Sequence, residues 1–307
     1  MQTLRMAINP YGLAARYDDP GVFVASARAA EAAGFSQYVV TDHVVMGERT
    51  DAYPYGAWPT PLDFPWWEPL TVLAAIATAT RRIELTQGIL IAPLRSAVLL
   101  AKQAATLDRL SGGRLALGLG TGWQREEYAA SGLNFADRRG LFIEQLRAMK
   151  SLWTQRCASF AGEHIRFERV YSSPKPTRPT GVPIHVGMAP SAANLPWLAE
   201  LADGWLPIET EPARYAPDIA RIKVALEQQR RDPAAFCVRA KLPTVAGRDG
   251  LPCLRATLAR RHELIRHGVT VAEIYPLEFL RGDSRAELAD WMDTCAELLA
   301  VDRDADA

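Results

Sequence analysis

The sequence has few cysteines, no long apolar run and no excess of charge, and each absence excludes a class of protein. Its four cysteines, Cys157, Cys237, Cys253 and Cys295, form no CxxC pair and have no histidine at metal-ligand spacing. No stretch approaches the roughly 18 apolar residues of a membrane span. The opening residues MQTLRMAINPYG lack a hydrophobic signal core. We therefore expect no metal site, no membrane association and a cytoplasmic location.

The charge balance and the absence of nucleotide-binding motifs exclude further classes of protein. Lys and Arg number 35, as do Asp and Glu, so the formal net charge is zero. A neutral chain has no electrostatic attraction for nucleic acid. Neither GxGxxG nor GxxxxGK[ST] occurs, so the fingerprints of dinucleotide and nucleoside triphosphate binding are missing. The expected partner is a small molecule.

What the sequence does contain is an alternation of apolar strands and amphipathic helices. Apolar residues make up 49% of the 307 residues, enough for a large core. We expect strands at Leu4–Asn9, Tyr38–Thr41, Ile83–Ile91, Leu115–Leu119, Pro183–Val186, Gly204–Ile208, Cys237–Val245 and Val269–Tyr275. We expect helices at Pro20–Ala33, Trp66–Thr80, Ser96–Leu110, Asp137–Trp153, Ser191–Ala202, Pro212–Arg230, Leu251–His267 and Ser284–Ala300. Eight repeats predict a single (β/α)8 TIM barrel over residues 1–307, with a doubly wound sheet as the alternative.

Two segments interrupt the alternation. Val44–Pro65, after the second strand, is rich in proline and aromatic residues, and an ordered loop of this length is typical of a lid. The aromatic residues of this lid either cover a flat ring system or simply pack the loop onto the barrel. Cys157–Pro183, before the fifth strand, is an insertion rich in proline and turn residues.

The carboxyl ends of barrel strands carry the active site, which selects candidate residues without an alignment. The second strand ends at Asp42-His43, the best acid/base candidate, because histidine changes charge near neutral pH and a carboxylate can orient it. Neighbours on a strand point to opposite faces, so both enter the site only if the strand bends. The alternative is a capping aspartate and a packed histidine.

Two glycine-containing loops at strand ends are candidate phosphate cradles. They are Gly120-Thr121-Gly122 after the fourth strand and Gly187-Met188-Ala189 after the fifth. Glycine lets backbone N–H groups approach an anion closely, and a helix that follows adds a favourable dipole. Each loop alone is equally consistent with a tight strand-to-helix turn.

Several linked stretches then resemble one known family. They are EAAGFSQYVVTDH, EPLTVLAAIATATRRIELTQGILIAPLRS, LAKQAATLDRLSGGRLALGLGTGWQREEY, the F-x-x-R to LWT pattern of Phe135–Thr154, and LADGW at Leu201–Trp205. Together they resemble the bacterial luciferase-like monooxygenase family, most closely its branch of F420-dependent oxidoreductases. The resemblance covers about Arg5–Pro207, and the last hundred residues match by barrel pattern alone.

The resemblance implies a TIM barrel that binds coenzyme F420 or, alternatively, reduced FMN in its mouth. It places a non-prolyl cis peptide of the third strand, which props the cofactor ring, at Gln87-Gly88. It assigns the phosphate to Gly120–Gly122 and to the loop after Gly187, where Met188 stands in place of a usual second glycine. Asp42-His43 matches the family's D-H pair, with His43 as acid/base or as a residue that steadies the anionic cofactor ring, and with Asp42 as a catalytic and cofactor-binding residue. A homodimer is expected on the same ground.

The function expected first is F420-dependent hydride transfer to or from a small organic substrate. The alternative is an FMNH2-dependent monooxygenase that inserts one oxygen atom from O2 and relies on a separate flavin reductase. A non-catalytic flavin-binding protein is the second alternative. An unrelated phosphate-binding barrel such as an aldolase is the third, with Lys241 as its only obvious catalytic lysine. The sequence leaves the substrate open.

Overall fold

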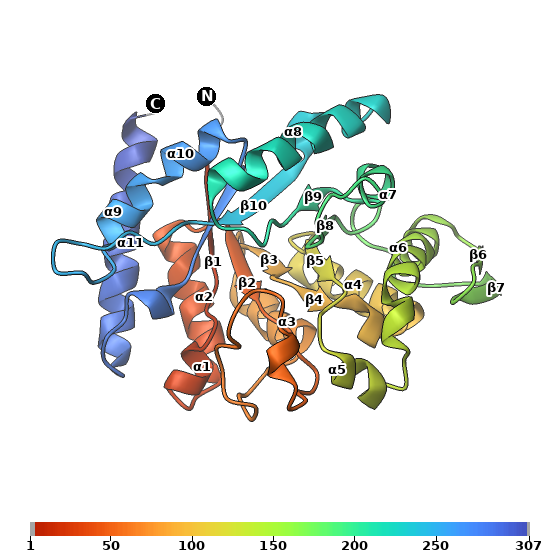
Figure 1. Cartoon of the computed structure of the whole chain (residues 1–307), viewed down its shortest axis with the longest axis horizontal. Helices are drawn as coiled ribbons and strands as arrows, with labels where there is room; N and C mark the ends of the chain where they lie inside the picture. The colour runs from red at the N-terminus through yellow and green to blue at the C-terminus, as the bar shows by residue number, and fades with distance from the viewer. Residues whose placement is uncertain (1–3, 306–307) are drawn as a thin grey trace.

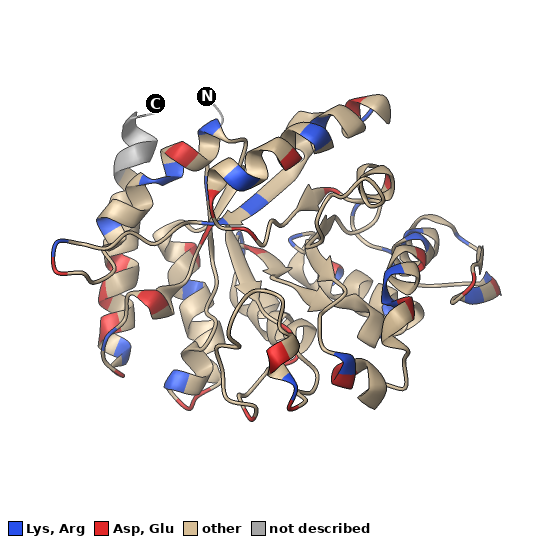
Figure 2. Cartoon of the chain, in the orientation of Figure 1, with Lys and Arg blue, Asp and Glu red and all other residues tan. Residues whose placement is uncertain are grey.

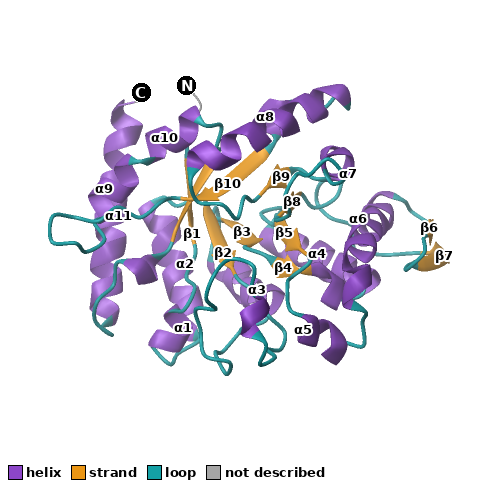
Figure 3. Ribbon diagram, in the orientation of Figure 1, coloured by secondary structure: helices purple, strands orange, loops and turns teal. Residues whose placement is uncertain are grey.

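The computed structural model describes residues 4–305, and its parallel strands form a barrel (Figures 1 and 3). Residues 1–3 and 306–307, which the single-domain prediction includes, lie outside the described part. The described sheet has nine strands in the order β3-β2-β1-β11-β10-β9-β8-β5-β4. Their bounds are β1 Arg5–Ile8, β2 Gln37–Val40, β3 Glu84–Gln87, β4 Leu90–Ile91, β5 Leu117–Gly120, β8 Ile184–Val186, β9 Gly204–Trp205, β10 Cys237–Lys241 and β11 Val271–Ile274.

The sheet closes because its two end strands belong to one segment. β3 and β4 are the halves of the predicted strand Ile83–Ile91, interrupted at Gly88-Ile89, and they stand at opposite ends of the strand order. Leu85 of β3 also bridges Leu115, just ahead of β5, so the gap between the halves is joined. With β3 and β4 counted as one, the barrel has the eight predicted strands. The TIM barrel prediction is confirmed, and the doubly wound alternative is wrong.

Helices surround the barrel, and local sequence sets their ends. Ser96 begins α4 (Ala97–Ser111) because its hydroxyl accepts the amide of Leu99, and Gly112 ends it in a left-handed conformation at φ 67°. The other main helices are α2 Gly21–Ala33, α3 Pro69–Ala79, α5 Arg125–Ala130, α6 Arg138–Thr154, α7 Leu195–Leu201, α8 Pro212–Gln228, α9 Leu254–Ala259, α10 Arg261–Arg266 and α11 Arg285–Ala305. Short helical segments fill the loops at α1 Leu13–Arg16, η1 Thr50–Ala52, η2 Ala92–Leu94, η3 Phe135–Asp137, η4 Pro233–Ala235 and η5 Pro276–Glu278.

The predicted elements differ from the structure mainly in the second half of the chain. β9 and β10 are shorter than predicted, and the predicted helix Leu251–His267 is divided into α9 and α10. The predicted helix Ser191–Ala202 begins only at Leu195, as α7, and Pro196 lies in its first turn, where proline's missing N–H is not needed.

Both predicted interruptions are present. Residues 44–65 form a loop between β2 and α3 that contains only the short η1. The insertion holds an antiparallel hairpin of β6 (Ala158–Ala161) and β7 (Arg166–Val170), which lies at the edge of the molecule in Figure 1.

A polar network fills the middle of the barrel. Arg239 on β10 forms a buried ion pair with Glu273 on β11, with Nε and Oε2 2.8 Å apart, and donates to the carbonyl of Gln87 at 2.6 Å. Glu273 in turn accepts a hydrogen bond from Asn9 at 2.7 Å. Arg239 and Glu273 compensate each other's charge, so the barrel interior carries charge without exposing it, although Nε of Arg239 meets Glu273 without hydrogen-bond geometry.

Charged residues of both signs are scattered over the outer helices, in keeping with the neutral composition (Figure 2). No helix among residues 4–305 is long and apolar enough to cross a membrane.

Candidate active site

His43 lies at the carboxyl end of β2 and is held by a carboxylate that is remote in the sequence. Its Nδ1 is 3.0 Å from Oε2 of Glu127 on α5, and the other oxygen of Glu127 accepts the amide of Val44 at 2.9 Å. The Glu127 side chain is 1% exposed and that of His43 9%. Nε2 of His43 has no hydrogen-bond partner within residues 4–305. This arrangement favours the tautomer with the proton on Nδ1 and leaves Nε2 for a ligand.

Asp42 points elsewhere, so the prediction that it orients His43 is wrong. Arg95 donates to both carboxylate oxygens of Asp42, at 2.8 and 3.0 Å, and the amide of Ile91 donates to Oδ2 at 2.8 Å. Both residues lie beyond the end of β2, and their side chains contact different parts of the chain, Asp42 the segment of β4 and Arg95, and His43 the helix α5. With both oxygens engaged, Asp42 links the end of β2 to β4 and to Arg95.

Arg95 is the cation shared by two ion pairs, one with Asp42 and one with Glu68. Burial acts to lower the pKa of its guanidinium, but the charges of Asp42 and Glu68 outweigh burial and raise that pKa. Glu68 lies 3.0 Å from Arg95, and its other oxygen caps the start of α3 by accepting the amide of Thr71. The ion pairs therefore join the ends of β2 and α3 beneath the lid.

An aromatic cluster surrounds His43, and we call it the lid cluster: Tyr53, Trp58, Trp66 and Trp123. The His43 ring centroid is 4.7 Å from that of Trp66, 5.3 Å from Trp58 and 6.3 Å from Trp123. The tryptophans come from the lid, from the loop before α3 and from the loop after β5. The lid therefore folds onto the barrel mouth, and His43 is in contact with it.

The lid cluster contains polar groups without partners. The indole N–H groups of Trp58, Trp66 and Trp123 are buried and find no acceptor within residues 4–305. Buried polar groups are nearly always hydrogen-bonded, so unsatisfied ones require an explanation. An indole N–H can only donate. The cluster therefore matches a flat ligand with hydrogen-bond acceptors at its edge.

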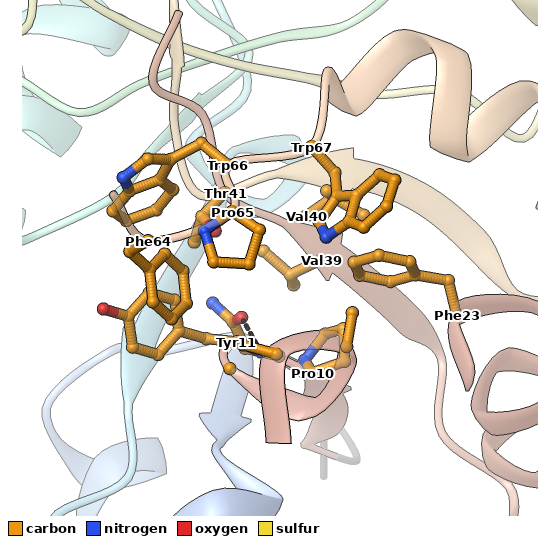
Figure 4. Close-up of a pocket in the computed structure, with 14 residues that line it drawn as sticks. Pro10, Tyr11, Phe23, Val39, Val40, Thr41, Phe64, Pro65, Trp66 and Trp67 are labelled. Atoms are coloured by element: carbon orange, nitrogen blue, oxygen red, sulfur yellow. Dashed lines mark hydrogen bonds between the residues drawn. The ribbon is translucent and has the colours of Figure 1, made fainter. Parts of the chain in front are cut away.

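A small cavity lies beside the cluster, under the lid (Figure 4). Tyr11, Phe64, Pro65 and Trp66 line one side of it, and Val39 and Val40 of β2 line its base. The Tyr11 and Phe64 rings are stacked, with centroids 5.5 Å apart. Its free volume of about 20 Å³ holds little more than one water molecule. A larger ligand therefore requires the lid to move.

The interruption of the third barrel strand places Ile89, which the sequence analysis did not select, at the mouth. The Gly88–Ile89 peptide bond is cis, one residue beyond the position expected from the resemblance. Gln87 itself is fully buried, and its Oε1 accepts the amide of Gly118 at 3.0 Å, so its side chain belongs to the barrel wall. The resemblance places Gln87 beside the cofactor, whereas in the structure its side chain contacts Gly118 within the barrel wall.

Two of the predicted phosphate glycines make room for Ile89. A Cβ at Gly120 would overlap Cδ1 of Ile89, and a Cβ at Gly187 would lie 2.7 Å from Cγ2 of the same side chain. The amide of Gly187 is also occupied, since it donates to Leu119 at 2.9 Å. Both glycines therefore serve packing at the strand break.

The amides next to these glycines are the free donors. The amides of Gly122, Met188 and Ala189 have no partner within residues 4–305. Gly122 has φ 64°, which favours glycine, whereas Met188 has no positive φ and needs no glycine. Arg139 anchors the second loop by donating to Asn194 and Ala193, and no carboxylate in the described part of the chain pairs with it. Thr121 accepts a hydrogen bond from Tyr128 through its carbonyl.

Sequence reasoning missed Glu127, Arg95 and Ile89. Glu127 lies 84 residues from His43 and Arg95 lies 53 from Asp42, so only the closed barrel brings each pair together. The single available signal for Glu127 was its place in the short helix that follows the end of the fourth predicted strand. Lys241, the aldolase candidate, pairs with Glu278, which disfavours a free catalytic amine. No group of three or more metal-ligating side chains is found within residues 4–305.

Comparison with known proteins gives concordant results. The family model for luciferase-like monooxygenases matches residues 5–297. An uncharacterised protein of Mycobacterium tuberculosis is 32% identical over 252 residues, which cover 79% of this chain and 81% of that protein.

Two solved structures share the fold. Monooxygenase RslO1 from Streptomyces bottropensis has a TM-score of 0.80 at 19% identity, covering 98% of this chain and 100% of that one. The coenzyme F420-dependent tetrahydromethanopterin reductase from Methanopyrus kandleri has a TM-score of 0.68 at 15% identity, covering 96% and 97%. At these sequence identities the two structures show only that the barrel fold is shared.

Proposed function

The chain belongs to the luciferase-like monooxygenase family, and we propose that it is an oxidoreductase that binds a reduced flavin-type cofactor at the barrel mouth. Coenzyme F420 is the first choice and FMN the alternative. The observation that carries the proposal is the combination at one place of a histidine with a free Nε2 and three buried indole N–H groups without acceptors.

The residues at the mouth fit the ring of such a cofactor. A flavin or deazaflavin ring is flat and apolar on its faces, and it carries carbonyl oxygens along one edge. The lid cluster supplies aromatic surfaces for the faces and donors for the edge. Ile89 is a half-buried apolar side chain at the strand break and contributes a further apolar surface.

The fit extends to the phosphate group that both cofactors carry. The free amides of Gly122, Met188 and Ala189 lie in the two loops that leave β5 and β8, which are paired neighbours in the sheet. Arg139 adds a positive charge next to the second loop. Backbone donors with a nearby cation are the usual means of holding phosphate. We assign these four residues to the phosphate.

The chain's own chemical contribution rests on the His43–Glu127 pair. When bound, F420 supplies or accepts a hydride, whereas reduced FMN supplies the electrons with which O2 gives one oxygen atom to the substrate. His43 takes up or releases a proton at Nε2, and the buried carboxylate of Glu127 stabilises the imidazolium form. The lid cluster excludes water from the reacting atoms.

F420 is preferred over FMN on family resemblance alone, and the two choices differ in their partners. An FMN-dependent enzyme needs a flavin reductase, and an F420-dependent one does not. A homodimer is part of the proposal on the same ground. A non-catalytic flavin carrier is the remaining alternative, and the His43–Glu127 pair argues against it because a carrier has no use for an oriented acid/base.

Titration of the purified protein with F420 and with FMN, followed by cofactor fluorescence, tests the cofactor assignment. Tight binding of F420 is the expected result. Binding of FMN with no response to F420 would replace the first choice by the alternative. If neither cofactor binds, the proposal is wrong.

Replacing His43 tests the role of the acid/base. We expect His43→Ala to retain cofactor binding and to lose turnover by about 10²–10⁴-fold. Glu127→Gln should keep the hydrogen bond but weaken support for the charged imidazole, and so should lose less. His262→Ala, at an exposed histidine on α10, is the matched control. Full turnover of His43→Ala with bound cofactor would remove the acid/base role.

A further inference from the structure

The opposite end of the barrel contains a second, larger cavity. It has a volume of about 360 Å³ and is lined by residues at the amino ends of the strands, among them Arg5, Glu84 and Cys237, the first residues of β1, β3 and β10. The mouth with His43 lies at the carboxyl ends of the same strands. Nothing in the proposed reaction uses this cavity, which could hold more than ten water molecules at about 30 Å³ each.

Three groups on the cavity lack a partner. Lys150 on α6 and Arg178 in the insertion line it, and neither forms a hydrogen bond or ion pair with any residue from 4 to 305. His185 on β8 lines the cavity and is 4% exposed, and neither of its ring nitrogens has a partner within residues 4–305. Burial and the neighbouring arginines lower the pKa of His185 to about 3, so this side chain is neutral and able to donate one hydrogen bond.

The carboxylates on the cavity are already compensated. Glu84 faces Arg5, with 3.6 Å between Nη1 and Oε2, and accepts a hydrogen bond from Gln37 at 2.6 Å. Asp203 pairs with Arg231 at 2.8 Å, and its other oxygen accepts the amide of Ile184 at 3.0 Å. Lys150 senses the charge of Asp203 and Arg178 that of Glu84 only at longer range, and neither cation has a carboxylate in hydrogen-bond contact within residues 4–305.

We propose that this cavity binds a small oxyanion of the phosphate class, held by Lys150, Arg178 and His185. A cationic amine that is partly buried without an acceptor is costly, and a phosphate group offers acceptors to all three groups at once. The cavity is larger than a phosphate ion, so a phosphorylated small molecule is the natural ligand class. The site is separate from the cofactor site and independent of the proposed reaction.

Thermal unfolding with inorganic phosphate as the probe tests the site, with ionic strength held constant by sodium chloride. A ligand that binds only the native state raises the unfolding midpoint, because it adds RT ln(1 + [L]/Kd) to the free energy of unfolding. We expect phosphate to stabilise the wild-type protein and expect Lys150→Met and Arg178→Met each to weaken its apparent affinity about tenfold. Arg166→Met is the matched control, because Arg166 is an exposed arginine of the same insertion that does not line the cavity.

Phosphate also resembles the cofactor's phosphate group, so the titration is repeated with saturating F420 or FMN. Stabilisation that persists with cofactor and is lost in the two cavity variants supports the proposal. Stabilisation that disappears with cofactor and is unchanged in Lys150→Met and Arg178→Met places phosphate at the mouth and overturns it. No stabilisation by phosphate, or an equal loss in Arg166→Met, overturns it as well.

Discussion

The packing of Ile89 between two glycines gives the sharpest prediction about the mouth. Alanine at position 120 introduces a Cβ that overlaps Cδ1 of Ile89 and lies 3.3 Å from its Cγ1. On its other side Ile89 lies against the backbone of Gly187, where an added Cβ would come within 2.7 Å of Cγ2, so Ile89 has little room to turn away. Gly120→Ala should therefore destabilise the protein by overpacking, independently of any phosphate.

The magnitude follows from the atoms involved. Overpacking of this kind costs about 1–3 kcal/mol. Ile89→Val removes Cδ1 and by itself costs about 0.5 kcal/mol, the low end of the usual range, because Ile89 is only half-buried. If Cδ1 is the obstacle, the double variant should be more stable than the sum of the two single changes by about 1–2 kcal/mol.

Gly187→Ala is the internal control. Its Cβ meets Cγ2 of Ile89, at 2.7 Å, and valine keeps that atom. Ile89→Val should therefore rescue Gly120→Ala and leave Gly187→Ala as unstable as before. The two glycines are equivalent in a purely phosphate-binding interpretation, which predicts no such difference.

Urea unfolding followed by tryptophan fluorescence measures all five variants in a phosphate-free buffer. The reasoning is refuted if the effects of Gly120→Ala and Ile89→Val add to within about 0.5 kcal/mol, the usual limit for independent sites. It is refuted equally if valine rescues both glycine variants to the same extent.

Three further predictions concern other parts of the chain. Arg95→Met should lower the free energy of unfolding by about 3–5 kcal/mol because it leaves Asp42 buried without its cation, whereas Arg147→Met, which breaks an exposed pair, should change it by less than about 1 kcal/mol in the same urea assay. The carboxylate of Glu31 is partly buried, which acts to raise its pKa, but hydrogen bonds from three backbone amides outweigh burial and hold that pKa below its ordinary value of 4.5. A depressed native pKa gives stability that is present above pH 4.5 and is lost as the pH falls through the native pKa. Glu31→Gln should therefore flatten the acid side of a profile of melting temperature against pH. Trp58→Phe removes an indole N–H that has no acceptor, and should weaken cofactor binding about fivefold, the value of one hydrogen bond; unchanged affinity in the fluorescence titration would mean that this indole only packs the lid.

The order and type of the elements could be read from the sequence because they rest on local physics. Buried parallel strands appear as apolar runs, and helices appear with serine or proline at their start and glycine at their end. α2, α4 and α6 lie within a residue or two of their predicted bounds. Shorter elements were less well predicted. β9 and β10 end where their neighbouring strands cease to pair with them, and this pairing leaves no local pattern in the sequence.

The candidate site was determined by the sequence only in part. His43 could be selected because it follows a buried strand, and the lid because no regular element explains so many aromatic residues. The carboxylate that serves His43 is Glu127 and not the adjacent Asp42, and Ile89 is the reason for Gly120 and Gly187. Side chains 30 to 100 residues apart meet only after the sheet closes, so their pairing depends on barrel geometry. Tertiary structure alone therefore decided which residues act together, while the sequence determined where along the chain they stand.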